Sequence, residues 1–218
     1  MIIVMGGEKG GTGKTTLATN LAAVRATADR DMLLVDTDPQ GSASNWATVR
    51  DESQTALPRI ACIQKFGRGI ARELRDLAGR YQDIIVDTGG RDSVELRGAL
   101  VVADVIAIPV QASQLDLWTI DQIDKVIQEA RALNPALRAS VVISRAPTHP
   151  HMADVADAKD LLNDFTSLQL VSVVIRERVA YRRAAGAGCS VHEFLPRDEA
   201  ACTEITALCT ELYGLLLK

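Results

Sequence analysis

A glycine-rich segment near the start of the chain has the residue types that bind phosphate. It reads GGEKGGTGKTT, from Gly6 to Thr16, directly after an apolar run. Glycines allow a tight turn that aims successive backbone N–H groups at one anion. Lys14 is spaced to reach the β- and γ-phosphates of a nucleotide, and the Thr15 hydroxyl to ligate Mg²⁺. The predicted nucleotide-binding residues are Gly10, Gly11, Thr12, Gly13, Lys14, Thr15 and Thr16.

This loop departs from the usual phosphate-loop pattern, G-x-x-x-x-G-K-[ST]. When the pattern is aligned on Gly13, its first glycine falls on Glu8, and a second lysine, Lys9, stands next to it. A strand, a glycine loop, the GKTT run and an amphipathic helix nevertheless follow one another in the right order. We therefore interpret the loop as a variant phosphate loop in which Lys9 has a second cationic role.

Carboxylates stand at the ends of two further apolar runs. LLVDTDPQG carries Asp36 and Asp38, and DIIVDTGG carries Asp87. The carboxyl ends of parallel strands meet at one edge of a sheet, where ligands of such sheets bind. Asp87 follows its strand as a Walker B aspartate does, which predicts that it holds Mg²⁺ through water. One such aspartate alone could simply cap a helix, but three beside a phosphate loop favour a metal and nucleotide site.

Apolar runs alternate with helical patterns along the whole chain. Several runs are apolar at consecutive positions, as strands buried on both faces are. Repeated β-α units predict an α/β fold with a mostly parallel sheet and helices on both faces. Without linkers or repeats, residues 1–218 are expected to form a single domain. The predicted strands are 2–5, 32–36, 59–63, 83–87, 105–110, 139–144 and 170–175, and the predicted helices are 14–28, 41–51, 67–80, 92–103, 114–133, 152–166, 177–187 and 198–217.

Composition and charge limit the classes of function. The 218 residues are 47% hydrophobic and 24% charged, with a net charge of −4. Contact with nucleic acid or an anionic membrane would therefore need a local basic patch. No signal-peptide pattern or run of about 18 apolar residues is seen, so we expect a cytoplasmic protein with no stable membrane insertion. The four cysteines lack C-x-x-C spacing and are expected to be reduced core residues.

Four segments together resemble the ParA/MinD family of deviant Walker A ATPases, and its ParA branch in particular. They are KGGTGKTT (9–16), LLVDTDPQGSASNW (33–46), IIVDTGG (84–90) and IPVQASQLDLW (108–118). The resemblance implies a P-loop NTPase that binds ATP and Mg²⁺, closes as an ATP-dependent homodimer, and turns over slowly until a ParB-like or other adaptor protein stimulates it.

The resemblance also assigns roles to individual residues. Lys9 takes the place of the signature lysine that crosses to the partner's phosphates, so Lys9, Lys14 and Asp38 are the predicted catalytic residues. Asp38 is expected to position or activate the attacking water. Asp36 is expected to help organise Mg²⁺ together with Thr15 and Asp87.

The chain departs from the family after the Walker B aspartate. Many relatives have proline there, whereas this chain reads Thr88-Gly89-Gly90-Arg91. We expect a more flexible loop whose Arg91 forms a surface ion pair with Asp92 or Glu95, with sensing of the γ-phosphate as the alternative. By resemblance alone, the adenine lies near residues 145–147 and Arg176.

The densest positive segment is RERVAYRRA, residues 176–184. It is expected to be helical, with Arg178 and Arg182 one turn apart. Such a patch binds DNA phosphates without reading sequence, and the resemblance implies nonspecific DNA binding by ATP dimers and association with the nucleoid. A solvated helix face with local ion pairs is the alternative. The predicted DNA-binding residues are Arg176, Arg178, Arg182 and Arg183.

Two other classes of function remain open. Membrane attachment of the MinD kind needs an exposed amphipathic helix rich in Lys and Arg. The C-terminal stretch EITALCTELYGLLLK has one lysine and two glutamates and is expected to pack on the domain instead. A metabolic P-loop enzyme of the dethiobiotin synthetase type would need a dedicated substrate pocket. The sequence does not identify the cargo or the partner protein.

Overall fold

The computed structural model describes residues 1–7, 9–53, 56–112, 117–148, 152–163 and 165–214. Its strands are β1 (Ile2–Met5), β2 (Met32–Asp36), β3 (Ala61–Gln64), β4 (Asp83–Asp87), β5 (Val105–Val110), β6 (Arg138–Ile143) and β7 (Gln169–Leu170). Its helices are α1 (Lys14–Thr27), α2 (Ser42–Asp51), α3 (Ile70–Ala78), α4 (Val94–Leu100), α5 (Leu117–Arg131), α6 (Met152–Asn163), α7 (Val179–Gly186) and α8 (Glu199–Tyr213).

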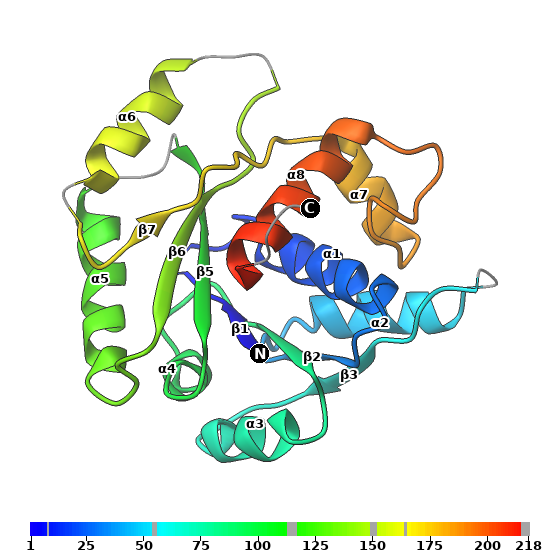
Figure 1. Cartoon of the computed structure of the whole chain (residues 1–218), viewed down its shortest axis with the longest axis horizontal. Coiled ribbons are helices and arrows are strands. Elements are labelled where there is room, and N and C mark those ends of the chain that lie inside the picture. Colours follow the sequence, from blue (N-terminus) through cyan, green and yellow to red (C-terminus); the bar gives the residue numbers. More distant parts are fainter. Residues whose placement is uncertain (8, 54–55, 113–116, 149–151, 164, 215–218) are drawn as a thin grey trace.

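The strands form one parallel sheet in the order β3-β2-β4-β1-β5-β6-β7 (Figure 1). The neighbouring strands β2, β4 and β1 are buried at every position because helices cover both faces. The register pairs Met5 with Asp87 and Asp36 with Asp87. The carboxylates at these strand ends therefore lie at one edge, beside the loop that leaves β1, as the sequence predicted.

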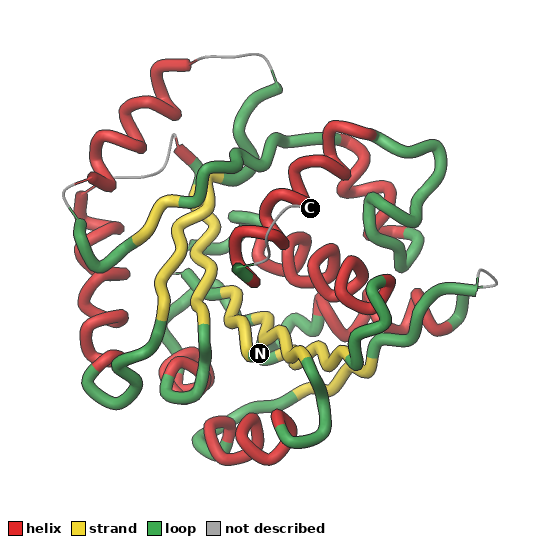
Figure 2. The backbone as a smooth tube through the Cα atoms, viewed as in Figure 1, coloured by secondary structure: helices red, strands yellow, loops and turns green. Residues whose placement is uncertain are grey.

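Helices cover both faces of the sheet, which confirms the predicted architecture (Figure 2). The apolar core on one face is closed by α1, α2, α7 and α8. The core on the other face is closed by α3, α4 and α5, with Leu162 of α6. All four cysteines are free, as predicted: Cys189, Cys202 and Cys209 are buried in the first core and Cys62 is half-buried against it.

The edges of the sheet and the helix ends differ most from the prediction. The last strand was expected over 170–175, but β7 is only Gln169–Leu170. The backbone N–H groups of Val171 and Ile175 donate to the carbonyls of Val141 and Ile143, so this segment advances four residues against two of β6 and the regular ladder stops. The final helix was expected to reach 217, and it ends at Tyr213 because Gly214 takes a left-handed conformation with φ of 63°. Residues 215–217 lie outside the described residues.

A buried ion pair fixes α2 to the segment that precedes α8. Arg50 donates to both carboxylate oxygens of Glu193, at 2.9 and 2.7 Å, and both side chains are buried. The same guanidinium donates to the carbonyls of Gly188 and Pro58. Burial by itself would raise the pKa of Glu193, but hydrogen bonds from Arg50 and Ser190 hold that pKa below its ordinary value.

Replacing Arg50 by methionine should lower the free energy of unfolding by about 3–5 kcal/mol at neutral pH, because it leaves the Glu193 carboxylate buried and unpaired. The pair's contribution is present above the ordinary glutamate pKa of 4.5 and is lost as the pH falls through the lower folded-state pKa. The difference between wild type and Arg50→Met should therefore shrink on acidification. Urea unfolding at several pH values measures it.

The matched control is Lys125→Met, which breaks the exposed i,i+4 pair with Asp121 on α5. An exposed pair of this kind contributes about 0.3–0.5 kcal/mol. An equal loss of stability in the two variants, or a loss from Arg50→Met that does not change with pH, would contradict the assignment.

Candidate functional site

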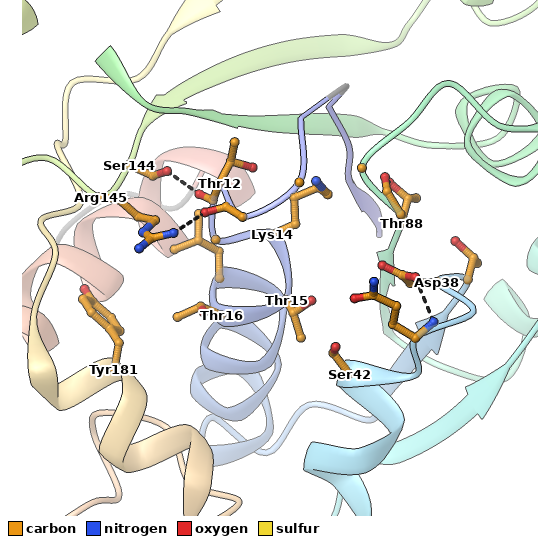
Figure 3. Close-up of a pocket in the computed structure, with 18 of the residues that line it drawn as sticks. Thr12, Lys14, Thr15, Thr16, Asp38, Ser42, Thr88, Ser144, Arg145 and Tyr181 are labelled. Carbon is orange, nitrogen blue, oxygen red and sulfur yellow. Dashed lines mark hydrogen bonds between the residues drawn. The ribbon is translucent and has the colours of Figure 1, made fainter. Parts of the chain in front are cut away.

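A cavity of about 840 Å³ opens at the carboxyl edge of the sheet, large enough for a cofactor or nucleotide. Figure 3 shows Lys14 and Thr15 at its centre, with Asp38 and Ser42 on one side and Ser144, Arg145 and Tyr181 on the other. The cavity is lined by every residue predicted to bind nucleotide, from Gly10 to Thr16. The sequence-predicted phosphate loop therefore forms the middle of the cavity.

The loop's backbone is shaped for an anion. Gly11 and Gly13 have φ values of 75° and 96°, which residues with a Cβ rarely adopt. Gly13 is the N-cap of α1 and supplies no side-chain cap, so the first N–H groups of α1 face the cavity with the positive end of the helix. Ser144 Oγ donates to the carbonyl of Thr12 and Arg145 Nη1 to that of Gly11, which fixes the loop from the β6 side.

Lys14 lies buried under the loop. Its Nζ donates to the carbonyl of Lys9 at 2.8 Å, so the ammonium sits at the outer end of the loop. Burial lowers the pKa of Lys14, while the charges of Asp87 and Asp38 oppose that shift. An ammonium that is largely desolvated and has this one carbonyl contact is suited to a phosphate group. Lys9 itself is half-buried at this end.

The Asp87 carboxylate is fully buried and accepts a 2.6 Å hydrogen bond from Thr15 Oγ1. Among the described residues, its Oδ1 has no hydrogen-bond partner. Burial raises the pKa of Asp87 to about 7, although the Thr15 hydrogen bond and the charge of Lys14 oppose it. The charges of Asp36 and Asp38 act in the same direction as burial. A buried, unsatisfied carboxylate oxygen beside a hydroxyl fits Mg²⁺, which takes oxygen ligands.

Asp36 is positioned next to Asp87 but has both oxygens engaged. Its Oδ1 accepts from the backbone N–H of Asp38, and its Oδ2 accepts from the N–H and hydroxyl of Ser44. It therefore fixes the turn that carries Asp38 and the start of α2. The role of Asp36 in organising Mg²⁺ stays a prediction, since its Oδ1 can still accept a further bond.

Asp38 faces the phosphate loop from across the cavity (Figure 3). It is half-buried, and its Oδ1 accepts from the N–H of Gln40 at 2.9 Å, which fixes the side chain within its own turn. The carboxylate is close enough to act electrostatically on Lys14, whose pKa it raises. This position, across from Thr15, suits a group that orients a water molecule near bound phosphate.

The loop after β4 packs directly on the phosphate loop. A Cβ at Gly90 would lie 2.8 Å from the Gly10 nitrogen, and one at Gly89 would lie 3.7 Å from Asp38 Cγ. Thr88 Oγ1 donates to the Met5 carbonyl and ties the start of the loop to β1. Glycine at position 90 is therefore required by this close approach, where a proline or any other side chain would not fit.

The ion pair expected for Arg91 is not formed. Asp92 pairs with Arg97 at 2.8 Å, and Glu95 accepts the N–H of Gly67 instead. Arg91 is exposed, lines the cavity, and has no hydrogen bond or ion pair with any residue the structure describes. The prediction for Arg91 was wrong because Arg97 of α4 binds the Asp92 carboxylate instead.

The far end of the cavity lies where the resemblance placed the adenine. Arg145 and Arg176 both line it, together with Ser144, Ile175 and Tyr181, which sequence reasoning did not identify. Arg145 also donates to Glu177 at 2.7 Å, joining the segment after β6 to the one before α7. Ser144 directly follows the buried strand β6, and this position could have identified it as a cavity residue. The local sequence around Tyr181 carries no comparable signal.

The four arginines of the predicted DNA patch have different surroundings. Arg178 is the N-cap of α7 and pairs with Glu204 at 2.7 Å, an interaction that raises the pKa of Arg178. The expectation that Arg178 and Arg182 lie one turn apart within a helix is thus corrected, because α7 begins at Val179 and Arg178 precedes it. Arg176 donates to the Pro147 carbonyl. Arg182 and Arg183 are exposed on α7.

Comparisons with known proteins agree with this geometry. Residues 3–191 match the model of the CobQ/CobB/MinD/ParA nucleotide binding domain. The chain is 30% identical over 205 residues, 94% of its length, to 92% of the maintenance of carboxysome distribution protein A of Halothiobacillus neapolitanus. It is 29% identical, over 65% of its length, to 63% of the chromosome partitioning protein ParA of Myxococcus xanthus. A Cyanothece McdA variant solved with ATP superposes with a TM-score of 0.76 at 16% identity, covering 100% of this chain and 97% of that one.

Proposed function

This chain belongs to the CobQ/CobB/MinD/ParA nucleotide-binding family, and from that premise we propose that it is an ATPase that positions DNA or a large cargo. The observation that supports ATP hydrolysis best is the cluster around Thr15. Its hydroxyl bonds to the buried Asp87, Lys14 lies at the outer end of the same loop, and Asp38 faces them across the cavity.

Each residue of the site has a separate proposed role in hydrolysis. The N–H groups of the loop and Lys14 bind the phosphates, and Thr15 and Asp87 hold Mg²⁺, which neutralises phosphate charge when bound. Asp38 orients the attacking water. Because the Asp38 carboxylate is only half-buried and already accepts the Gln40 N–H, we expect slow intrinsic turnover until an adaptor protein, ParB-like or of another kind, completes the site.

ATP is proposed to close two copies of the chain face to face. The faces that meet are those on which the cavity opens, and Lys9 of each copy reaches the phosphates held by the other. The similar proteins named above distribute carboxysomes or partition chromosomes. We extend to this chain the element that those names share, the positioning of a large cargo. We propose that an ATP-dependent dimer performs it in the cytoplasm, associated with the nucleoid.

Nonspecific DNA is the proposed track for this movement. Arg182 and Arg183 are exposed on α7. A dimer would present this pair of arginines twice, so that weak contacts from the two copies combine into bivalent DNA binding. Attachment to a membrane through the last helix is not supported. Ile205, Leu208 and Leu212 of α8 are buried in the core, and no helix among the described residues is long and apolar enough to span a bilayer.

Asp38→Ala should leave ATP binding intact and slow hydrolysis by about 10²–10⁴-fold, because the water loses its orienting carboxylate. Phosphate release under single-turnover conditions measures the rate, and equilibrium titration measures ATP affinity. The control is Asp51→Ala, which removes an exposed carboxylate at the end of α2 and should hydrolyse ATP as wild type does. Unchanged turnover in Asp38→Ala would exclude this role.

The DNA interface is tested by the double variant Arg182→Ala, Arg183→Ala. It should bind all duplex sequences more weakly, and the slope of log affinity against log salt should fall by about 0.9 for each DNA phosphate that the variant no longer neutralises. The control Arg72→Ala, Arg75→Ala removes the same charge from exposed sites on α3, which covers the opposite face of the sheet. Binding is titrated at several salt concentrations with ATP and with ADP.

Arg182 also lines the cavity, so Arg183→Ala alone separates DNA binding from nucleotide binding. The single variant should weaken DNA binding and leave ATP affinity unchanged. DNA binding that is equal with ATP and ADP, or unaltered in the double variant, would contradict the proposed ATP-dependent DNA binding through these arginines.

A further inference from the structure

The position of the Lys14 ammonium indicates which end of the cavity would hold a terminal phosphate. Lys14 Nζ rests on the carbonyl of Lys9 at 2.8 Å, at the outer end of the loop. A lysine in this position of a phosphate loop contacts the β- and γ-phosphates. Tyr181 and Arg145 lie on the other side of the loop, at the end left for the base (Figure 3). The γ-phosphate of a bound triphosphate therefore belongs near Lys9 and Gly10.

The loop after β4 covers that same end. The position of a Cβ on Gly90 falls 2.8 Å from the nitrogen of Gly10, 2.9 Å from its Cα and 3.1 Å from the carbonyl carbon of Lys9. Backbone thus meets backbone, with no side chain between the two loops. Arg91 is the next residue and lines the cavity, so its guanidinium stands on a backbone that is fixed to the γ end of the site.

Among the described residues, no neighbour balances the charge of Arg91. The adjacent Asp92 is paired with Arg97, and Glu95 is bonded to the N–H of Gly67. Arg91 is exposed and has no ion pair among the described residues. The site beside it already holds the carboxylates of Asp36, Asp38 and Asp87. A triphosphate adds more negative charge than one divalent cation neutralises, and a guanidinium presents a donor fork that matches phosphate oxygens.

We propose that Arg91 contacts the γ-phosphate of bound ATP and so lets this site distinguish ATP from ADP. The inference rests on the proposed ATPase function and adds a residue to it. ADP lacks the group that Arg91 would contact, so removal of the guanidinium should weaken triphosphate binding selectively. A purely structural role of Arg91 would affect both nucleotides alike.

The test measures the affinities of AMPPNP and ADP, each with Mg²⁺, for wild type, Arg91→Ala and Arg91→Lys by calorimetric titration. Arg91→Ala should weaken AMPPNP binding by at least about 10-fold, the effect of removing one charge-assisted hydrogen bond, and change ADP binding by less than about 2-fold. Arg91→Lys should fall between wild type and alanine because it keeps the charge and removes the fork. Arg72→Ala, an exposed arginine of α3, is the control and should match wild type for both nucleotides.

The outcomes separate this inference from the function on which it rests. If wild type binds both nucleotides and Arg91→Ala binds AMPPNP as tightly as wild type does, Arg91 makes no γ-phosphate contact and the proposed ATPase stands. Equal weakening for AMPPNP and ADP also overturns the inference. If wild type binds neither nucleotide, the proposed function itself fails. Thermal unfolding of each variant without nucleotide checks that the exposed substitution leaves the fold intact.

Discussion

The buried carboxylate of Asp87 is the constraint around which this edge of the sheet is organised. It is fully inaccessible, its pKa is raised to about 7 chiefly by burial, and its Oδ1 has no partner among the described residues. Such a group costs stability unless something nearby compensates it. Thr15 from α1 supplies a hydrogen bond and Lys14 supplies a charge, so the start of α1 and the end of β4 are tied together.

The same carboxylate explains how the other loops are arranged. Register pairs Asp36 with Asp87, and Asp36 uses both its oxygens to hold the turn that carries Asp38 and the start of α2. The loop that follows Asp87 lies on Gly10 through Gly90 and beside Asp38 through Gly89. Three segments far apart in the sequence thus contact one another around one anion site. We expect a ligand bound at this edge to act on all three segments together, as the proposed nucleotide-dependent switch requires.

The central strands and the phosphate loop could be predicted from the sequence, whereas the last strand and the partners of the arginines could not. Strands buried on both faces, such as β1, β2 and β4, are apolar at consecutive positions, and the glycines and GKTT run of the phosphate loop are local features. The errors arose where distant residues compete for the same group. Glu204 of α8 takes Arg178 from the basic patch. Competition also occurs locally: Arg97 of α4 takes the Asp92 carboxylate that was expected to pair with Arg91.

Closure of two copies on ATP is the central claim, and light scattering of the wild type and Lys9→Ala with AMPPNP and with ADP tests it most directly. We predict that wild type has the mass of a dimer with AMPPNP and of a monomer with ADP. Lys9→Ala should bind AMPPNP and remain a monomer with either nucleotide. A wild-type mass that is the same with both nucleotides, or a Lys9→Ala variant that dimerises with AMPPNP as wild type does, would contradict it.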